Sequence, residues 1–340
     1  MFQQGSFEQQ GMLKLGISIS TLSKIADLLK DKRSPMWALY QARKLSSERI
    51  TAAEKIFGKN LLFSLTVDVE HDFGIPESAG SFMTVEKGIS NLMKLLDEKN
   101  MDATFFVMKT VSDKVPNHLK RMGSRHEVGL HGYAHECWGE PKWWLRHDRP
   151  LTTEQKREYL AESLDAVEKA TSHTPKSFRA PYLVIDMESL RLLDEFGFEV
   201  DSSSPSYYGI PPKPYRPNGL SLLEIPVSAD PRPWPELVSI PHFRFDYLNT
   251  KLLARRGVGW CTNFAANIVS YQAERGIKPH VVMLTHQWEF LGVKNVPGKS
   301  FEYARGENVV LLEGFLAKLS EMFKTRFVTM QELAKRVAPA

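Results

Sequence analysis

The 340-residue sequence lacks the features that mark several large classes of protein. It has only two cysteines, Cys137 and Cys261, which are too few for a disulfide scaffold. No run of eighteen apolar residues is present, so no membrane span is predicted. The net charge is +4, but no run of five or more Lys or Arg occurs, and we therefore expect no nucleic-acid partner.

The N-terminus also lacks the basic start and apolar stretch of a secretory signal peptide, which predicts a cytoplasmic protein. Apolar residues at helical spacing predict one helix over 13–29 and a second over 34–58. We assign residues 1–59 as an N-terminal helical extension. The first helix is expected to dock on the main domain, with peripheral contact to a membrane surface as the alternative. Nothing in the sequence indicates the oligomeric state.

Beyond residue 60 the pattern changes to short apolar runs that alternate with helices. Strands are expected at 61–67, 103–107, 126–131, 177–181, 198–202, 222–227, 281–286 and 326–330. Helices are expected at 84–100, 152–172, 187–197, 260–275 and 307–325. This alternation is typical of an α/β fold with a parallel sheet and outer helices. The strand count favours a (β/α) barrel of about seven parallel strands over residues 60–340.

Ionisable residues follow five of the predicted strands. The first strand ends in the acidic segment 68–72, and the third ends in a segment with two histidines. Single ionisable residues, Arg179, Asp201 and His286, end three others. Functional groups of a parallel barrel gather at the carboxyl ends of its strands, so these side chains are expected on one rim.

His131 and His135 are four residues apart and can bind one metal ion if a turn or helix aligns them. Two imidazoles and one carboxylate with open positions form a catalytic metal site. Asp68 and Glu70 point to the same side of an extended chain, so one can bind the metal and the other can accept a proton. The alternative is a pair of surface or capping histidines beside solvated carboxylates.

The remaining strand-end residues each allow two interpretations. Arg179 beside an apolar turn can hold a buried carboxylate, whereas most arginines are surface charges. Asp201 can serve the site or cap a turn with the serines that follow it. His286 can act in catalysis or be a core histidine whose ring nitrogens are satisfied.

Taken together, these motifs resemble the polysaccharide deacetylases, the family-four carbohydrate esterases. The resemblance is carried, in the family's order, by TVDVE (66–70), ATFFV (103–107), HGYAH (131–135), FRAPY (178–182), VDSS (200–203), LLEIP (222–226), LTH (284–286) and FVTMQELA (327–334). It implies a distorted (β/α) barrel that holds one divalent metal ion, usually zinc. It also implies a hydrolase that removes N-acetyl groups from an amino sugar or glycan by attack of metal-activated water.

The resemblance further assigns a role to each site residue. Asp68 would be the general base, oriented by Arg179, and His131 and His135 would bind the metal. Tyr182 would donate its backbone N–H to the oxyanion. His286 would be the general acid, tuned by Asp201.

One position departs from the family's usual pair of adjacent aspartates. Val69 stands where the second aspartate would bind the metal. Some members that look similar carry D-x-D, so Glu70 is the predicted third ligand. His71 and Asp72 are the alternatives.

Other functions fit parts of this pattern. One is a deformylase or deacetylase of a lipid-linked sugar, or another C–N amide hydrolase of the same superfamily. A second is a catalytically inactive sugar-binding protein. Five tryptophans on or near expected loops could stack on sugar rings or simply pack in the interior: Trp138, Trp143, Trp144, Trp234 and Trp288.

Overall fold

Parallel strands alternate with helices through the part of the chain that the computed structural model describes, which is residues 56–74, 81–140, 149–205, 212–229, 247–291 and 307–339. The strands are β1 (Asn60–Val69), β2 (Thr104–Val107), β3 (Glu127–Leu130), β4 (Ser177–Phe178), β5 (Val200–Asp201), β6 (Leu223–Glu224), β7 (His280–His286) and β8 (Lys324–Phe327). The α-helices are α5 (Val85–Lys99), α6 (Lys109–Ser112), α7 (Pro116–Gly123), α8 (Thr153–Thr171), α9 (Met187–Glu195), α10 (Thr250–Arg256), α11 (Val258–Glu274), α12 (Glu307–Met322) and α13 (Met330–Val337). Short 3-10 turns are η1 (Asp72–Gly74), η4 (Pro181–Leu183), η5 (Pro217–Gly219) and η7 (Gln287–Phe290).

Strand β1 is the centre of the sheet. All of its residues except Asn60 are buried, as expected for a parallel strand that is covered on both faces. Strand β7 pairs with β1 from Leu62 to Asp68. The register of the other two neighbours is staggered, because β8 pairs with the first half of β1 and β2 with the second half. The carboxyl end of β1 therefore lies between β2 and β7.

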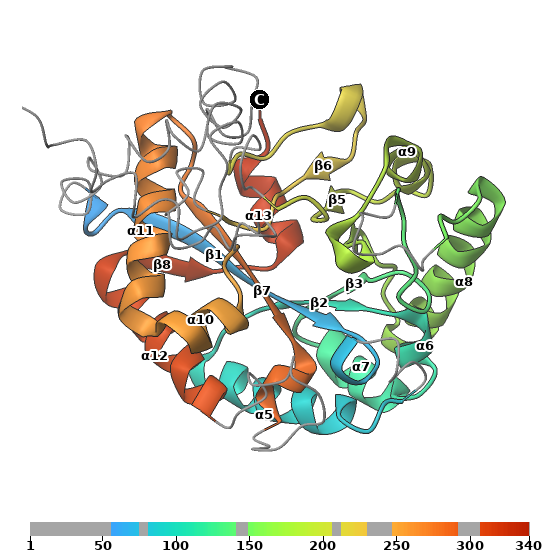
Figure 1. Cartoon of the computed structure of the whole chain (residues 1–340), viewed down its shortest axis with the longest axis horizontal. Coiled ribbons are helices and arrows are strands. Elements are labelled where there is room, and N and C mark those ends of the chain that lie inside the picture. The colour runs from blue at the N-terminus through green and yellow to red at the C-terminus, as the bar shows by residue number, and fades with distance from the viewer. Residues whose placement is uncertain are drawn as a thin grey trace, which may run out of the picture. The chain divides into compact units, whose positions relative to one another are not determined.

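The strand order is β6-β5-β4-β3-β2-β1-β7, with β8 beside β1, and all of the strand pairs are parallel. The two ends of this series are joined by single hydrogen bonds instead of a ladder. The Ser228 N–H donates to the Val282 carbonyl (3.0 Å), and Leu248 links Ser228 to Leu284. Figure 1 shows helices α5, α8, α11 and α12 outside the strands. The predicted α/β class and distorted barrel are confirmed.

The interior of the barrel is filled from the end opposite the predicted site. Met330 and Leu333 of α13 pack with inward-facing residues of β1, β2, β5, β6 and β7 in one buried cluster. Phe106 of β2 belongs to this cluster and carries the Arg179 guanidinium 4.4 Å from its ring centroid. Apolar packing therefore closes one end, and polar groups occupy the other.

Some of the expected features lie in parts of the chain that the structure does not describe. Most of the expected N-terminal extension, residues 1–55, lies outside the described residues, as do Trp143, Trp144 and Trp234. Within the described ranges, no helix combines the length and apolar character needed to cross a membrane. Cys137 and Cys261 are both buried, and they form no disulfide with each other.

Acid is expected to destabilise the fold through His126, whose ring is buried against Phe105. Burial, aided by the charge of Arg125, lowers the His126 pKa from 6.5 to about 4. The stabilising effect is complete above pH 6.5 and is lost as the pH falls towards 4, because the unfolded chain then binds the proton first. We expect the unfolding free energy of wild type to fall by about 3 kcal/mol relative to that of His126→Leu over this range, as measured by urea unfolding.

The control for this prediction is His173→Leu. His173 is exposed, so its replacement is expected to leave the pH dependence unchanged. A constant difference between wild type and His126→Leu at every pH would contradict the prediction.

Candidate metal centre and active site

Side chains from the carboxyl ends of four strands line one pocket of about 190 Å³. Asp68 and Glu70 come from the end of β1, His131 and His135 follow β3, Tyr182 follows β4, and His286 ends β7. The other lining residues are Phe73, Gly74, Leu183, Tyr247, Leu284 and Trp288. The structure thus brings most of the sequence-predicted residues together, whereas Arg179 and Asp201 lie behind the pocket wall and do not line it.

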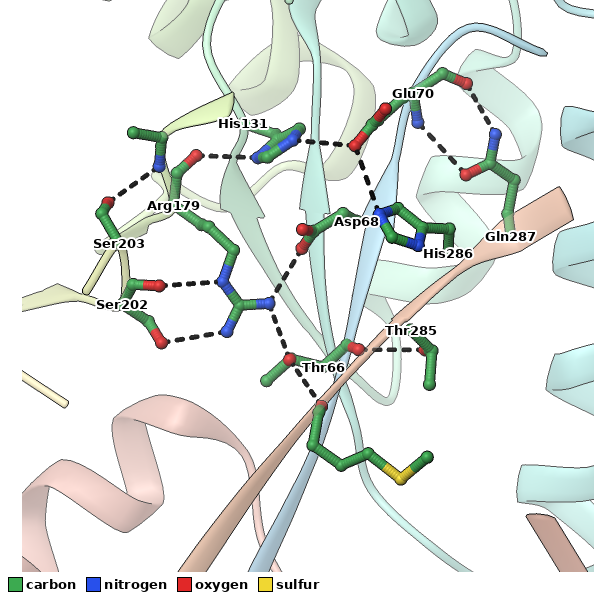
Figure 2. Close-up of polar contacts among 12 residues, drawn as sticks. Thr66, Asp68, Glu70, His131, Arg179, Ser202, Ser203, Thr285, His286 and Gln287 are labelled. Atoms are coloured by element: carbon green, nitrogen blue, oxygen red, sulfur yellow. Dashed lines mark hydrogen bonds and ion pairs between the residues drawn. The ribbon is translucent and has the colours of Figure 1, made fainter. Parts of the chain in front are cut away.

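Glu70 is the centre of the cluster. Its Oε1 lies 3.1 Å from His131 Nε2 and 3.7 Å from His286 Nε2, and its Oε2 lies 3.0 Å from His135 Nε2 (Figure 2 shows the first two). Burial opposes ionisation of Glu70, but the charge of His135 and the hydrogen bonds of His131 and His135 hold its pKa well below the usual value. Three ring nitrogens therefore converge on one buried carboxylate.

The hydrogen bonds of His131 test whether a cation fits this cluster. Its Nδ1 lies 2.8 Å from the Arg179 carbonyl, which can only accept, so Nδ1 carries the proton. In the neutral ring, Nε2 then presents a lone pair to a Glu70 oxygen that also only accepts. A proton or a metal ion must lie between them. Histidines that bind metals commonly donate their other nitrogen to a backbone carbonyl in this way. The donor atoms of Glu70, His131 and His135 lie within 4.8 Å of one another, so the set fits a divalent ion.

The two alternative ligands occupy other positions. The Asp72 carboxylate accepts hydrogen bonds from the backbone N–H groups of Met83 (2.9 Å) and Thr84 (2.8 Å), and so ties η1 to the start of α5. His71 lies edge-on to His135, with ring centroids 5.2 Å apart. Neither belongs to a set of converging ligand atoms in the described structure. Glu70 stays the predicted third ligand.

The backbone of Glu70 is held by a residue that the sequence analysis missed. The Gln287 side chain accepts from the Glu70 N–H (3.2 Å) and donates to the Glu70 carbonyl (2.6 Å), as Figure 2 shows. This amide continues the pairing of β1 with β7 beyond Asp68 and His286, the last pair of the register. Glu70 is thereby fixed relative to His286.

A turn, not a helix, brings the two histidines of HGYAH together. Glu136 was not predicted to matter, yet its carboxylate accepts from the N–H groups of Tyr133 (2.8 Å) and Ala134 (2.6 Å) and from Trp138 Nε1 (2.8 Å). Trp138 itself is fully buried and packs on Phe178, so it is a core residue. His135 adopts a left-handed backbone conformation with φ 75°. The carboxylate therefore stabilises a turn that is costly for a residue with a side chain.

Replacing Glu136 by glutamine is expected to weaken metal binding about ten- to a hundredfold, because the amide offers one acceptor oxygen where the turn uses two. The free energy of unfolding should fall by about 1–3 kcal/mol. Isothermal titration with zinc and urea unfolding measure the two effects. Glu140→Gln, at an exposed site nearby, is the matched control, and equal zinc affinity in the two variants would contradict the prediction.

Arg179 is a fully buried cation whose hydrogen bonds are directed at the site (Figure 2). Its Nη1 donates to Asp68 Oδ1 (2.9 Å) and to Thr66 Oγ1 (2.7 Å). Its Nε and Nη2 donate to the carbonyl and hydroxyl of Ser202. The expected contact between Arg179 and Asp68 is present, and the surrounding donors and acceptors leave the guanidinium one orientation.

Asp201 differs from its expected placement. Its Oδ1 accepts from the Ser203 hydroxyl (2.6 Å), and its carboxyl group faces Glu224. Burial and the charge of Asp201 raise the Glu224 pKa well above the usual value, and burial raises the pKa of Asp201. No described contact joins Asp201 to His286. Asp201 therefore lies beside Glu224 behind Arg179, and not beside His286.

The carboxylate beside His286 belongs to Glu289, which was not predicted. Its Oε1 lies 3.6 Å from His286 Nδ1, and Trp288 stacks on the imidazole with ring centroids 4.3 Å apart. Burial alone would lower the His286 pKa, but Glu289, Glu70 and Asp68 raise it to about 9. The His-x-x-Glu spacing at a strand end is the one sequence signal that could have indicated this pair.

Tyr182 lies in η4 with a left-handed backbone conformation, φ 60°. Its ring meets His135 edge-on, with centroids 4.4 Å apart. The position at the pocket wall agrees with the expected place of the oxyanion donor, whose role stays a prediction.

Comparisons with known proteins give a consistent result. Residues 76–200 match the model of the polysaccharide deacetylase family. This segment holds His131, His135, Arg179 and Tyr182, whereas Asp68, Glu70, Asp201 and His286 lie outside it.

A peptidoglycan deacetylase-like protein of Gibberella zeae is 30% identical over 129 residues, 37% of this chain and 35% of that protein. The peptidoglycan deacetylase of Helicobacter pylori is 28% identical over 119 residues, 35% of this chain and 37% of that enzyme. The matches thus span about a third of these relatives. A candidate polysaccharide deacetylase of Mycobacterium smegmatis shares the fold, with a TM-score of 0.56 and 21% identity over 82% of this chain and 91% of that one. The resemblance predicted from the motifs is confirmed.

Proposed function

Since this chain resembles the polysaccharide deacetylase family in both sequence and fold, we propose that it is a metal-dependent hydrolase that removes N-acetyl groups from an amino sugar or glycan. The observation that carries the proposal is the convergence of His131 and His135 on Glu70, with the Asp68 carboxylate in the same pocket. Two imidazoles and one carboxylate favour zinc. The Asp68 carboxylate is then free to accept a proton.

Different residues of the pocket serve different steps of amide hydrolysis. A divalent ion held by Glu70, His131 and His135 would supply Lewis acidity towards water and the amide oxygen. Asp68 accepts the proton of the attacking water on Oδ2, because Arg179 holds its Oδ1. The Tyr182 backbone N–H donates to the oxygen that gains negative charge.

The leaving amine needs a proton before it can depart. His286 reaches the pocket from the end of β7, and its Nε2 side faces Glu70. A histidine there can give its proton to the nitrogen as the C–N bond breaks. The products are acetate and a free amino sugar.

The test measures metal content and acetate release together, in wild type and His131→Ala. N-acetylglucosamine oligomers and a lipid-linked N-acetyl sugar are offered as substrates. We expect about one divalent ion per wild-type chain, loss of that ion in His131→Ala, and acetate release by wild type only. Wild-type protein that holds no metal would contradict the proposal.

Two other outcomes identify the remaining candidates. Release of formate from a formylated, lipid-linked amino sugar, without release of acetate, would indicate a deformylase. Binding of metal and sugar with no acyl release would indicate an inactive sugar-binding protein.

A further inference from the structure

We infer that Glu289, and not Asp201, is the residue that positions and charge-balances His286. This inference rests on the proposed function, in which His286 protonates the leaving amine. It gives Glu289 a role that acts through His286, without contact with the substrate.

The first support is the geometry of the imidazole. Glu289 Oε2 accepts from the His286 backbone N–H (2.9 Å), while Oε1 lies 3.6 Å from Nδ1. Among the described residues, Nδ1 has no hydrogen-bond partner, although it is buried. The opposite nitrogen, Nε2, points to the pocket, 3.7 Å from Glu70. Catalytic hydrogen bonds are often long before the substrate binds, so the Nδ1 contact has room to shorten.

The second support is that the turn carrying Glu289 is fixed from outside. The Asn308 side chain donates to the Glu289 carbonyl (2.8 Å), and Asn91 donates to the Phe290 carbonyl (2.7 Å). Gly88 of α5 packs so closely that an added Cβ would lie 2.1 Å from the Gln287 carbonyl oxygen. Trp288, stacked on the imidazole, restricts rotation of its ring. Glu289 is therefore held next to His286 by α5 and α12.

The third support is that Asp201 is engaged elsewhere. Its Oδ1 accepts from the Ser203 hydroxyl, its carboxyl group faces Glu224, and Arg179 lies nearby. Among the described residues no contact joins Asp201 to His286, so Asp201 has no direct means of orienting the imidazole. Glu289 is only 5% exposed, so its charge acts on His286 with little solvent screening.

The chemistry places one proton on each side of the ring. As the Nδ1 contact shortens when substrate binds, Nδ1–H donates to Glu289, which keeps that proton in place and directs the transferable proton to Nε2. When the C–N bond breaks, its electron pair goes to the amine nitrogen, which takes the Nε2 proton. The ring becomes neutral, and Nδ1 keeps its proton, which points to Glu289.

The test is a double-mutant cycle with Glu289→Gln, His286→Asn and the double variant, using the fully metallated enzyme. Glutamine keeps the shape and can still accept from the His286 N–H. We expect Glu289→Gln to lower kcat for acetate release from the N-acetyl sugar about ten- to a hundredfold. In the His286→Asn background the same change should have no further effect. Glu321→Gln, which is exposed on α12, is the matched control.

Leaving-group chemistry provides the second readout. para-Nitrophenyl acetate releases a stable phenolate that needs no proton, so Glu289→Gln should lose much less activity on this ester than on the amide. Equal losses on the amide and the ester, or a further loss in the His286→Asn background, would show a structural role and overturn the inference.

The outcome also separates this inference from the proposed function. A wild-type enzyme that releases acetate, with unchanged amide activity in Glu289→Gln, overturns the inference alone. Failure of wild type to cleave any N-acyl sugar overturns the function and the inference together.

Discussion

Replacing Asp68 by asparagine is expected to lower kcat/KM for amide hydrolysis about a thousandfold while the protein keeps its divalent ion. Asp68 is buried, and Arg179 fixes one of its oxygens. Asparagine preserves the shape and can still accept from the guanidinium. It cannot take a proton from water, so the loss is expected in catalysis and not in metal affinity.

The measurement combines acetate release with metal analysis of the same preparation. Asp165→Asn, exposed on α8, is the matched control. Asp68 also belongs to a second possible ligand set with Glu70 and His286, whose donor atoms lie within 4.8 Å of one another. Loss of the metal ion in Asp68→Asn would favour that set and contradict the role of Asp68 as a free base.

Replacing Arg179 by methionine is expected to lower the free energy of unfolding by about 3–5 kcal/mol. Arg179 is fully buried, and the change leaves the Asp68 carboxylate buried without its cation. Breaking a buried ion pair from one side is costly because the remaining charge is neither solvated nor compensated. Urea unfolding of the metal-free protein measures the effect without any contribution from ion binding.

The double variant Arg179→Met/Asp68→Asn identifies the cause. Removal of both charges should restore part of the lost stability, so the two effects should be clearly non-additive. Arg157→Met, where the lost pair with Glu195 is exposed on both sides, should change stability by less than about 1 kcal/mol. Additive effects at Arg179 and Asp68 would contradict an ion pair as the source.

Apolar runs and helical spacing were sufficient to predict the larger part of the fold. The long helices α5, α8 and α12 agree with their predicted ranges to within a few residues. The short helices α6, α7 and α10 were missed, because four to eight residues carry too little periodicity. Strands β4, β5 and β6 contain two residues each, so their motifs located them better than their hydrophobicity did.

For the site, the sequence indicated which residues meet but not what holds them. Asp68, Glu70 and the histidines stand at strand ends, and barrel topology alone brings strand ends together. Glu136, Gln287 and Glu289 act through turns whose course depends on packing against distant helices. The expected influence of Asp201 on His286 has no described contact behind it, since Glu224 on β6 lies beside the Asp201 carboxyl group instead.

The staggered pairing around β1 has a consequence for how the chain is made on the ribosome. β1 is translated first among the described strands, yet two of its neighbours, β7 and β8, come more than 200 residues later. At about 5–20 residues per second, that delay lasts on the order of ten to forty seconds. During this time one edge of β1 has no strand to pair with, and such an edge can template aggregation. Nascent chains stalled before β7 should therefore bind chaperones that recognise extended apolar segments, and release from them should coincide with the emergence of residues 280–327.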